Sequence, residues 1–413
     1  MDQYKERRQT VLSRMPDNAM VVVTGAVRQH QSADQYYPFQ QTGDFYYLTG
    51  WTEPDGVLIL IKQSGMRSIL FHTGENAHDQ RWHGRNISHG DAIQIYGFNQ
   101  AEPREKFDKW LAQHRSKFEH VHFYMTQVNP RYQSTNSQSS NIEIKTWLAE
   151  MRLIKSEQEL AHIRRACSIT TQAHRLTIEA AAQSQFENER EVAATFQYHS
   201  MMLGADRLAY DTIAASGDNA CILHYTDNNE DIKAGSCILL DAGASCGSYA
   251  ADVTRTWPIS GQFSREQAII YDIVFEAHQS CFAMLKSGVK MSDVQKLSQK
   301  MLVDGLITHG IVEKECDSDT VFKAFYGHGV GHSLGLDVHD PSPPRGAFEL
   351  RENVVVTLEP GLYITSHELL KDKRFLGIGV RLEDNCLVKT NGALNLTQAV
   401  PIKRSEIELL MRK

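Results

Sequence analysis

Three short apolar segments in the second half of the chain each lead into an acidic residue. The pairs are residues 237–240 before Asp241, residues 354–358 before Glu359, and residues 378–382 before Glu383. Segments of this length and composition are typical of buried β-strands. A carboxylate beside a buried strand is costly unless it is paired or bound to a metal, so these acids are candidates for a chemical role. For Glu383, an exposed edge strand with a surface ion pair is the alternative.

A fourth acid, Asp252, follows Asp241 eleven residues later. If the chain turns near Cys246 and Gly247, the two aspartates lie directly opposite each other in a hairpin, with their Cβ atoms roughly 5 Å apart. Carboxylates that close repel each other unless a cation lies between them. The alternative is that Asp241 caps a turn and that Asp252 is solvated.

Three histidines, His328, His332 and His339, lie within twelve positions of one another. The glycines around the first two argue against a helix, and in an extended segment residues four apart lie on the same face. A single histidine is usually an ordinary core or surface residue, whereas this cluster favours a site.

Together these patterns predict a metal site with five protein ligands. The ligands are Asp241, Asp252, His332, Glu359 and Glu383. Carboxylates and imidazole suit Mn²⁺, Mg²⁺ or Fe²⁺ better than the thiolate-rich sites of structural zinc. Five ligands are too many for one tetrahedral ion and fit a bridged pair. Two ions about 3.5–4 Å apart can hold a bridging hydroxide and polarise a carbonyl, which indicates a hydrolase.

Composition excludes several other functions. The 413 residues are 41% hydrophobic, which is enough for globular cores, and their net charge of -7 gives no reason to expect nucleic acid or an anionic membrane as a partner. No apolar run approaches the roughly 20 residues of a membrane helix, and the charged amino terminus does not resemble a signal peptide. Seven scattered cysteines without a Cys-x-x-Cys pair indicate reduced thiols. We therefore expect a cytoplasmic protein.

The length favours two domains, residues 1–150 and residues 151–413. In the first, segments of strand and helix length alternate, which predicts a mixed α/β domain with a largely parallel sheet. The expected strands are residues 20–23, 57–61, 68–71 and 120–124, the expected helix is residues 104–118, and polar residues 127–141 are expected to form a loop. In the second, capping-box patterns at Ser156 and Ser264 predict two helix starts, and the first helix should run to about residue 182.

Several strings in the second domain resemble a known family. They are LLDAG at 239–243, ADVTRTWP at 251–258, GHGVGHSLGLDVHD at 327–340, LEPGLYI at 358–364 and GVRLED at 379–384. They resemble the metallopeptidases of the pita-bread fold, above all aminopeptidase P, with prolidase as a close relative. The resemblance implies an α/β (α+β) chain, in which a mixed α/β domain precedes a catalytic pita-bread domain.

The resemblance also implies residue roles. Asp241 and Asp252 would bind metal, His332 and Glu359 would each bind one ion, and Asp252 and Glu383 would bridge two divalent ions, with Mn²⁺ the expected metal. Glu359 would also handle the proton of the attacking hydroxide. His224 and His339 match histidines that face the substrate and the scissile peptide. His328, Tyr363 and Arg381 match supporting positions around the site, and Arg381 is counted with the catalytic residues.

The first domain resembles the amino-terminal domain of aminopeptidase P around residues 32–55 and 81–85. In that family a tryptophan is supplied to a neighbouring subunit's active site, which makes Trp82 a candidate substrate contact. Ordinary packing is the alternative. Asp34 would lie near the substrate end of the cleft. A homodimer or homotetramer is therefore expected.

The activity implied by the resemblance is removal of the amino-terminal residue from peptides with proline in second position. One alternative is a dipeptidase restricted to Xaa-Pro dipeptides, which would require a cleft that is blocked beyond the second residue. A more remote alternative is a non-catalytic binding protein of the same fold. The intact set of metal-binding residue types argues against that last alternative.

Overall fold

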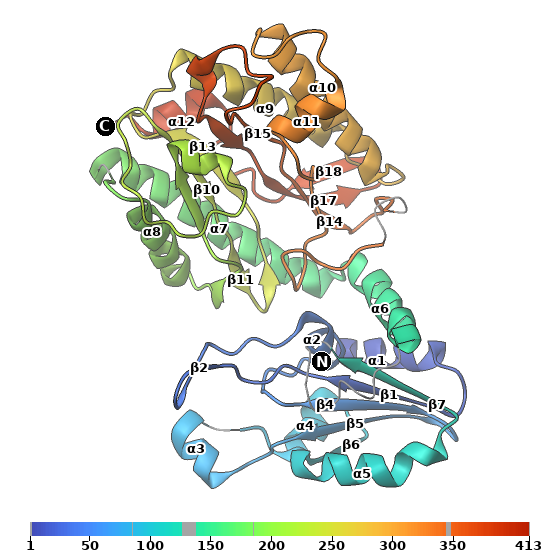
Figure 1. The fold of residues 1–413 in the computed structure, drawn as a ribbon. Coiled ribbons are helices and arrows are strands. Elements are labelled where there is room, and N and C mark those ends of the chain that lie inside the picture. The colour runs from blue at the N-terminus through green and yellow to red at the C-terminus, as the bar shows by residue number, and fades with distance from the viewer. Residues whose placement is uncertain (1, 85, 126–137, 185, 344–347, 413) are drawn as a thin grey trace. The chain divides into compact units, whose positions relative to one another are not determined.

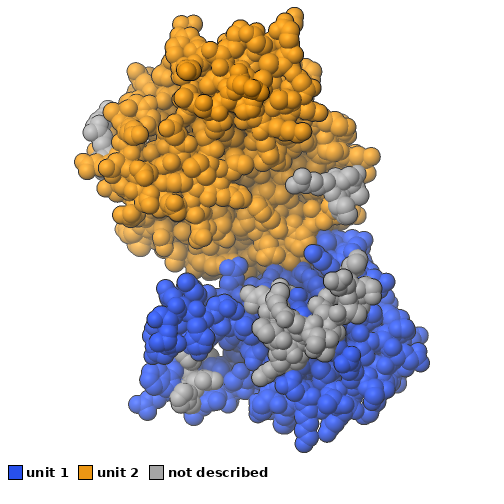
Figure 2. Space-filling view, viewed as in Figure 1, with its two compact units in different colours: residues 1–151 blue, residues 152–413 orange. Residues whose placement is uncertain are grey.

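The computed structural model describes residues 2–84, 86–125, 138–184, 186–343 and 348–412. The chain divides into two compact units, residues 1–151 and residues 152–413 (Figures 1 and 2). The expected α/β fold class, with a mixed domain before a catalytic domain, is confirmed. No helix among the described residues is long and apolar enough to cross a membrane.

The first unit is a mixed sheet with helices around it. Its elements are α1 (Asp2–Arg14), β1 (Ala19–Thr24), β2 (His30–Ser32), β3 (Gln35–Tyr36), α2 (Gly43–Thr49), β4 (Val57–Lys62), β5 (Met66–His72), α3 (Ala77–His83), α4 (His89–Tyr96), β6 (Gln100–Pro103), α5 (Phe107–His114), β7 (His120–Met125) and α6 (Gln138–Leu153). The five main strands lie in the order β6-β5-β4-β1-β7. Every residue of β1 is buried, because this strand lies inside the sheet.

The expectation of a largely parallel sheet is wrong. Strand β4 pairs antiparallel with both β1 and β5, while β1–β7 and β5–β6 are parallel. The reason is the short connection between β4 and β5, which spans only residues 63–65. A hairpin can turn over so few residues, whereas parallel neighbours need a crossover of a dozen or more. In the segment expected to be a polar loop, residues 126–137 lie outside the described residues, and residues 138–141 belong to α6.

The second unit places its strands among long helices (Figure 1). Its elements are α7 (Glu157–Ser184), α8 (Glu189–Met202), β8 (Arg207–Leu208), β9 (Ile213–Ser216), β10 (Cys237–Asp241), β11 (Ala244–Cys246), β12 (Tyr249–Ala250), β13 (Thr254–Pro258), α9 (Arg265–Met284), α10 (Met291–Thr308), α11 (Ser318–Phe325), β14 (Val355–Leu358), β15 (Gly361–Tyr363), β16 (Gly379–Arg381), β17 (Asp384–Lys389), β18 (Gly392–Asn395) and α12 (Arg404–Leu410). Apolar residues of α7 to α10 pack against β9 and β10 in one buried core.

Both expected capping boxes start helices of the second unit. At α7, the Ser156 hydroxyl accepts from the Glu159 backbone N–H at 3.4 Å, and the Glu159 carboxylate accepts from the Ser156 N–H at 2.9 Å. At α9, Ser264 and Gln267 exchange the same two hydrogen bonds. Each box satisfies amide groups that the first turn of a helix otherwise leaves without partners. The predicted helix starts are therefore confirmed.

Candidate metal centre

The first two predicted ligands lie at the ends of neighbouring antiparallel strands, because Asp252 precedes β13 by two residues. Asp241 ends β10, and it lies opposite Thr254 of β13 rather than opposite Asp252. The expected turn at residues 246–247 falls at 247–248, between the paired residues Cys246 and Tyr249. This shifts the register by two residues from the predicted one. Because side chains alternate between the faces of a sheet, an even shift leaves both aspartates on one face.

The other two acids come from a second pair of strands. Glu359 follows β14 and Glu383 precedes β17, and in the ladder between them Leu358 lies opposite Asp384. Both acids therefore leave this sheet at the same end. The two sheets are joined at this point, because the Glu383 N–H donates to the Thr254 carbonyl at 3.0 Å and the Thr254 hydroxyl donates to the Glu383 carboxylate at 2.8 Å.

The segment with the three histidines forms turns, with a single isolated bridge between Ser333 and Val356, and no helix. His332 Nδ1 lies 3.1 Å from the Ser333 carbonyl, which can only accept, so Nε2 is the nitrogen that faces the acids. It lies 3.5 Å from Asp252 Oδ2 and 3.6 Å from Glu359 Oε1. His328 also faces Glu359, as a shared-face pair would, because its Nδ1 lies 3.7 Å from Glu359 Oε2. Its Nε2 lies 2.8 Å from the Tyr363 hydroxyl.

Three of the five predicted ligands form a tight donor group. One ligand atom each from Asp252, His332 and Glu383 lies within 4.8 Å of the others. Asp241 and Glu359 lie beside this group. Both oxygens of Asp241 hold hydrogen bonds, Oδ1 from the Tyr210 hydroxyl at 2.5 Å and Oδ2 from Arg381 at 2.6 Å.

The electrostatics of this cluster favour a bound cation. Burial and the neighbouring carboxylates raise the pKa of Glu383 well above its usual range. Burial also raises the pKa of Glu359 to about 7, although His332 and Arg381 oppose the rise. For His332, burial would lower the pKa, but Asp252 and Glu359 outweigh it and raise the pKa to about 9. Within the described residues, Glu383 Oε1 has no hydrogen-bond partner although it is buried. The donor set therefore fits divalent metal.

The supporting residues form a chain of hydrogen bonds to the acids. Arg381 donates to the Tyr363 hydroxyl at 2.8 Å, to the Thr254 hydroxyl at 3.2 Å and to Asp241. The same Tyr363 hydroxyl lies 2.8 Å from His328 Nε2, so the structure brings His328, Tyr363 and Arg381 together, and their supporting role stays a prediction. This chain holds Asp241 in one orientation.

His224 and His339 lie at the exposed side of the centre. The ring centroids of His339 and His332 are 4.3 Å apart. Burial, with the charge of His332, lowers the pKa of His339. His224 follows the short helix η4 (Gly217–Cys221), and its charge contributes to lowering the pKa of both His328 and His339. All three histidines therefore share one electrostatic environment.

Two predicted site residues belong to the first unit. Trp82 lies on α3 with 68% of its surface exposed. Asp34 lies between β2 and β3 and is exposed. Their substrate contacts stay predictions.

Sequence reasoning missed Tyr210 and Thr254. The Tyr210 hydroxyl lies 2.5 Å from an oxygen of both Asp241 and Asp252. No pattern marked this residue, because it comes from the loop between β8 and β9. Thr254 could have been found, since it follows Asp252 by two positions, the spacing at which residues of an extended segment lie on the same face.

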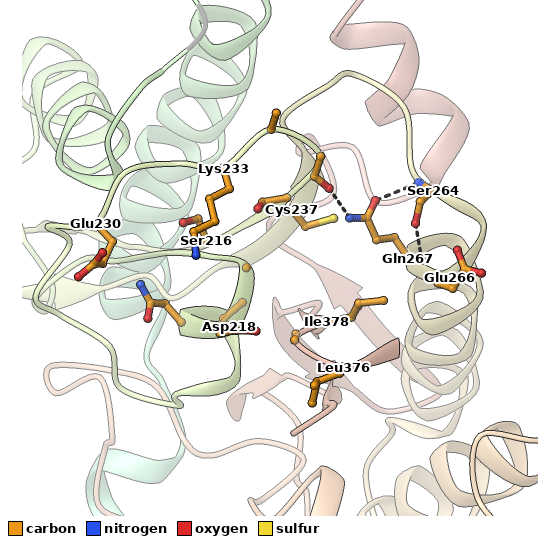
Figure 3. A pocket seen from close by; sticks show the side chains of 18 of the residues that line it. Ser216, Asp218, Glu230, Lys233, Cys237, Ser264, Glu266, Gln267, Leu376 and Ile378 are labelled. Atoms are coloured by element: carbon orange, nitrogen blue, oxygen red, sulfur yellow. Dashed lines mark hydrogen bonds between the residues drawn. The ribbon is translucent and has the colours of Figure 1, made fainter. Parts of the chain in front are cut away.

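A separate pocket of about 480 Å³ lies elsewhere in the second unit (Figure 3). It is lined by η4, residues 230–237, the start of α9 and residues 374–379. Arg374 at its edge is already paired with Asp372 at 2.6 Å and with Glu266 at 3.5 Å. Among the described residues that line it, none is a predicted site residue. The metal centre is therefore distinct from this pocket.

Comparison with known proteins places this geometry in a family. Residues 161–390 match the model of metallopeptidase family M24, and residues 4–123 match the amino-terminal domain of aminopeptidase P. The chain belongs to metallopeptidase family M24. It is therefore a peptidase, and the expected family and enzyme class are confirmed. Members of this family hold divalent metal, in agreement with the donor set described above.

Similarity extends over the full length of M24 relatives. The chain is 33% identical to the Xaa-Pro aminopeptidase of Escherichia coli, over 99% of this chain and 97% of the relative. It is also 33% identical to the Xaa-Pro aminopeptidase of Haemophilus influenzae, with the same coverage. Among solved structures, aminopeptidase P from E. coli with the inhibitor Pro-Leu matches with a TM-score of 0.89 and 30% identity, over 99% of this chain and 98% of that one.

Proposed function

We propose that this M24 peptidase is an aminopeptidase that removes the first residue of peptides with proline in second position. The observation that carries the proposal is the donor group of Asp252, His332 and Glu383, within 4.8 Å of one another, in a chain similar to Xaa-Pro aminopeptidases over its full length. That full-length similarity favours an aminopeptidase over the dipeptidase alternative. The assembled donor group argues against a non-catalytic binding protein.

Two divalent ions would be held by the four acids and His332, with Asp252 and Glu383 shared between them. Mn²⁺ is the metal that we propose, because oxygen donors dominate the set. Bound metal supplies a Lewis acid for the carbonyl before proline and lowers the pKa of a water to near neutrality.

The side chains around the ions would orient the substrate and move protons. Glu359 lies at the donor group, with its Oε1 3.6 Å from His332 Nε2, and we assign it to the proton of the attacking water. His339 and His224 lie on the exposed side, where a peptide would enter. We assign them to binding the scissile peptide and to protonating the proline nitrogen as it leaves. Arg381 and Tyr363 would hold Asp241 in position during these steps.

Proline explains why such an enzyme is needed. The Xaa-Pro bond is a tertiary amide without an N–H, and its ring fixes the backbone, so general peptidases fit it poorly. Asp34 and Trp82 of the first unit are proposed as further substrate contacts, Trp82 through a neighbouring subunit of a homodimer or homotetramer. We also propose a cytoplasmic location, because all seven cysteines are free thiols.

Mass spectrometry of products tests this proposal. The Mn²⁺-loaded chain is incubated with Ala-Pro, Ala-Pro-Ala-Ala and Ala-Ala-Ala-Ala, each with a chelator control and with the Glu383→Gln variant. We expect chelator-sensitive release of alanine from Ala-Pro-Ala-Ala, with Ala-Ala-Ala-Ala intact. Cleavage of Ala-Pro alone would indicate the dipeptidase. No cleavage of any peptide would contradict the proposal.

A further inference from the structure

A cluster of opposite charges, buried except for the Asp337 side chain, lies beside the candidate metal centre without being part of it. The Asp340 side chain is 1% exposed and accepts from Arg152 at 2.5 Å and from Lys155 Nζ at 3.1 Å. Arg152 also donates to Asp337 at 2.7 Å. The side chains of Arg152 and Lys155 are 2% and 1% exposed. Two acids and two cations therefore balance, and we call these four residues the Asp340 clamp.

The Asp340 clamp folds the loop of residues 333–340 around one carboxylate. The Asp340 N–H donates to the Ser333 carbonyl at 2.9 Å, and its carboxylate accepts from the Asp337 N–H at 3.2 Å. At Gly335, a Cβ atom would lie 2.7 Å from Asp340 Cγ, so only glycine allows this close approach. The loop connects His332 to His339, and these contacts fasten it at Ser333, Asp337 and Asp340.

The two cations are themselves anchored to the strand that leads to Glu359. The Lys155 N–H donates to the Asn353 carbonyl at 2.9 Å, and Ile154 forms an isolated bridge with Val354, just before β14. Lys155 Nζ also donates to the Arg152 carbonyl at 2.7 Å. The clamp therefore ties the histidine loop to β14.

The Asp340 clamp would fix the position of His339. His339 precedes Asp340 directly, and its ring lies 4.3 Å from that of His332, centroid to centroid. We propose that Arg152 and Lys155 act through Asp340 as positioning residues for His339. The inference rests on the proposed function, in which His339 contacts the scissile peptide. Although burial would raise the pKa of Asp340, Arg152 and Lys155 lower it on balance, so the clamp stays ionised.

Two variants loosen the clamp to different degrees. Lys155→Met removes one cation but keeps the Arg152 contacts, whereas Asp340→Asn removes the central charge. Loss of a group that orients a site residue typically lowers activity by about 10- to 100-fold. We expect a fall of this size in kcat, with KM and the affinity for Mn²⁺ little changed. As a matched control, Asp272→Asn opens the Arg404–Asp272 ion pair, at 2.6 and 2.7 Å, between α9 and α12.

A double-mutant cycle separates positioning from a general loss of stability. The kcat/KM on Ala-Pro-Ala-Ala is measured for Lys155→Met, Asp340→Asn and Asp272→Asn, each alone and together with His339→Gln. If the clamp acts through His339, its two variants lose most of their effect once His339 is replaced. Equal fold-losses in both backgrounds, or a His339→Gln variant with full activity, would overturn the inference.

Amide hydrogen exchange decides the same question without activity. We expect faster exchange over residues 333–340 in Lys155→Met and Asp340→Asn, but not in Asp272→Asn. Unchanged exchange in both clamp variants would overturn the inference. If the unaltered chain hydrolyses no peptide, the proposed function is contradicted. The exchange result would then still show whether the Asp340 clamp holds residues 333–340.

Discussion

Glu383 and Asp384 are neighbours in the chain, and both are buried, yet their surroundings are opposite. Glu383 is repelled by Asp241, Asp252 and Glu359, and its pKa is raised. Asp384 accepts from Arg255 at 2.7 Å and lies 3.2 Å from His278 Nε2. Burial alone would raise the pKa of Asp384, but the Arg255 guanidinium and the contact with His278 outweigh it and lower the pKa far below its usual range. One acid has its cation within the chain, and the other requires a cation from solution.

The difference follows from side-chain alternation at the start of β17. Consecutive residues of an extended strand point to opposite faces. Asp384 points toward Arg255, whose side chain is fully buried, and the Thr397 hydroxyl also donates to Asp384 at 2.7 Å. Glu383 points toward the metal centre. Asp384 should therefore stabilise the fold under all conditions, and Glu383 should do so only through metal.

The largest effect is expected for Asp384→Asn. This change leaves the Arg255 guanidinium buried without its counter-charge, which typically costs about 3–5 kcal/mol. Urea unfolding should show this loss of stability equally with chelator and with Mn²⁺. A loss that appears only in the presence of Mn²⁺ would break the comparison.

Glu383→Gln should behave in the opposite way. Without metal, this variant should be at least as stable as the unaltered chain, because one repelling carboxylate is gone. Activity on Ala-Pro-Ala-Ala should fall by more than about 100-fold. This is more than is usual when a residue that only hydrogen-bonds to a metal ligand is replaced. Titration calorimetry should show weakened or missing Mn²⁺ binding. Full binding with lost activity would show that Glu383 is not a ligand.

The pH dependence of stability extends the comparison to Asp340, a second buried acid that is paired with cationic side chains of the chain itself. Because its folded pKa is lowered, Asp340 contributes stability above its unfolded pKa of about 3.9, and this contribution is lost as pH falls through the lower folded value. The stability difference between the unaltered chain and Asp340→Asn should be constant above about pH 5 and shrink below about pH 4. Urea unfolding from pH 3 to 7 measures it. A difference that grew at low pH would contradict this sign.

The smallest effect is expected at Tyr210, whose hydroxyl touches both aspartates. Tyr210→Phe should weaken Mn²⁺ binding by about tenfold, because the hydroxyl orients carboxylates that are themselves proposed ligands. Tyr271→Phe is the matched control, since it removes a buried hydroxyl that donates to the Ile402 carbonyl at 2.7 Å away from the centre. Titration calorimetry measures the Mn²⁺ affinity of both variants. Equal affinities in Tyr210→Phe and Tyr271→Phe would show that Tyr210 contributes to packing only.

The sequence predicted the elements that carry the site better than their exact pairing. Asp241, Glu359 and Glu383 were found because each adjoins an apolar strand, a local property of the chain, and Asp252 was found from its spacing to Asp241. The hairpin of Asp241 and Asp252 was placed two residues out of register, because the position of the turn depends on backbone conformation at residues 247–248. The parallel sheet was wrong for a similar reason, since one short connection decides between a hairpin and a crossover.

Residues that act from loops were out of reach of sequence patterns. Tyr210 reaches the aspartates from 31 positions before Asp241. Lys155 meets Asp340 across 185 positions. Contacts of this kind form only once the helices and sheets have packed. No periodicity in the sequence therefore predicts them.

Thermal unfolding of the metal-free chain, with and without added Mn²⁺, tests the central claim most directly. A ligand present at 100 times its dissociation constant stabilises the folded state by about 2.7 kcal/mol. We predict that Mn²⁺ raises the midpoint of the unaltered chain and of a folded Asp384→Asn variant, but not of Glu383→Gln. An equal rise in Glu383→Gln, or no rise in the unaltered chain, would contradict a cation held by the Glu383 cluster.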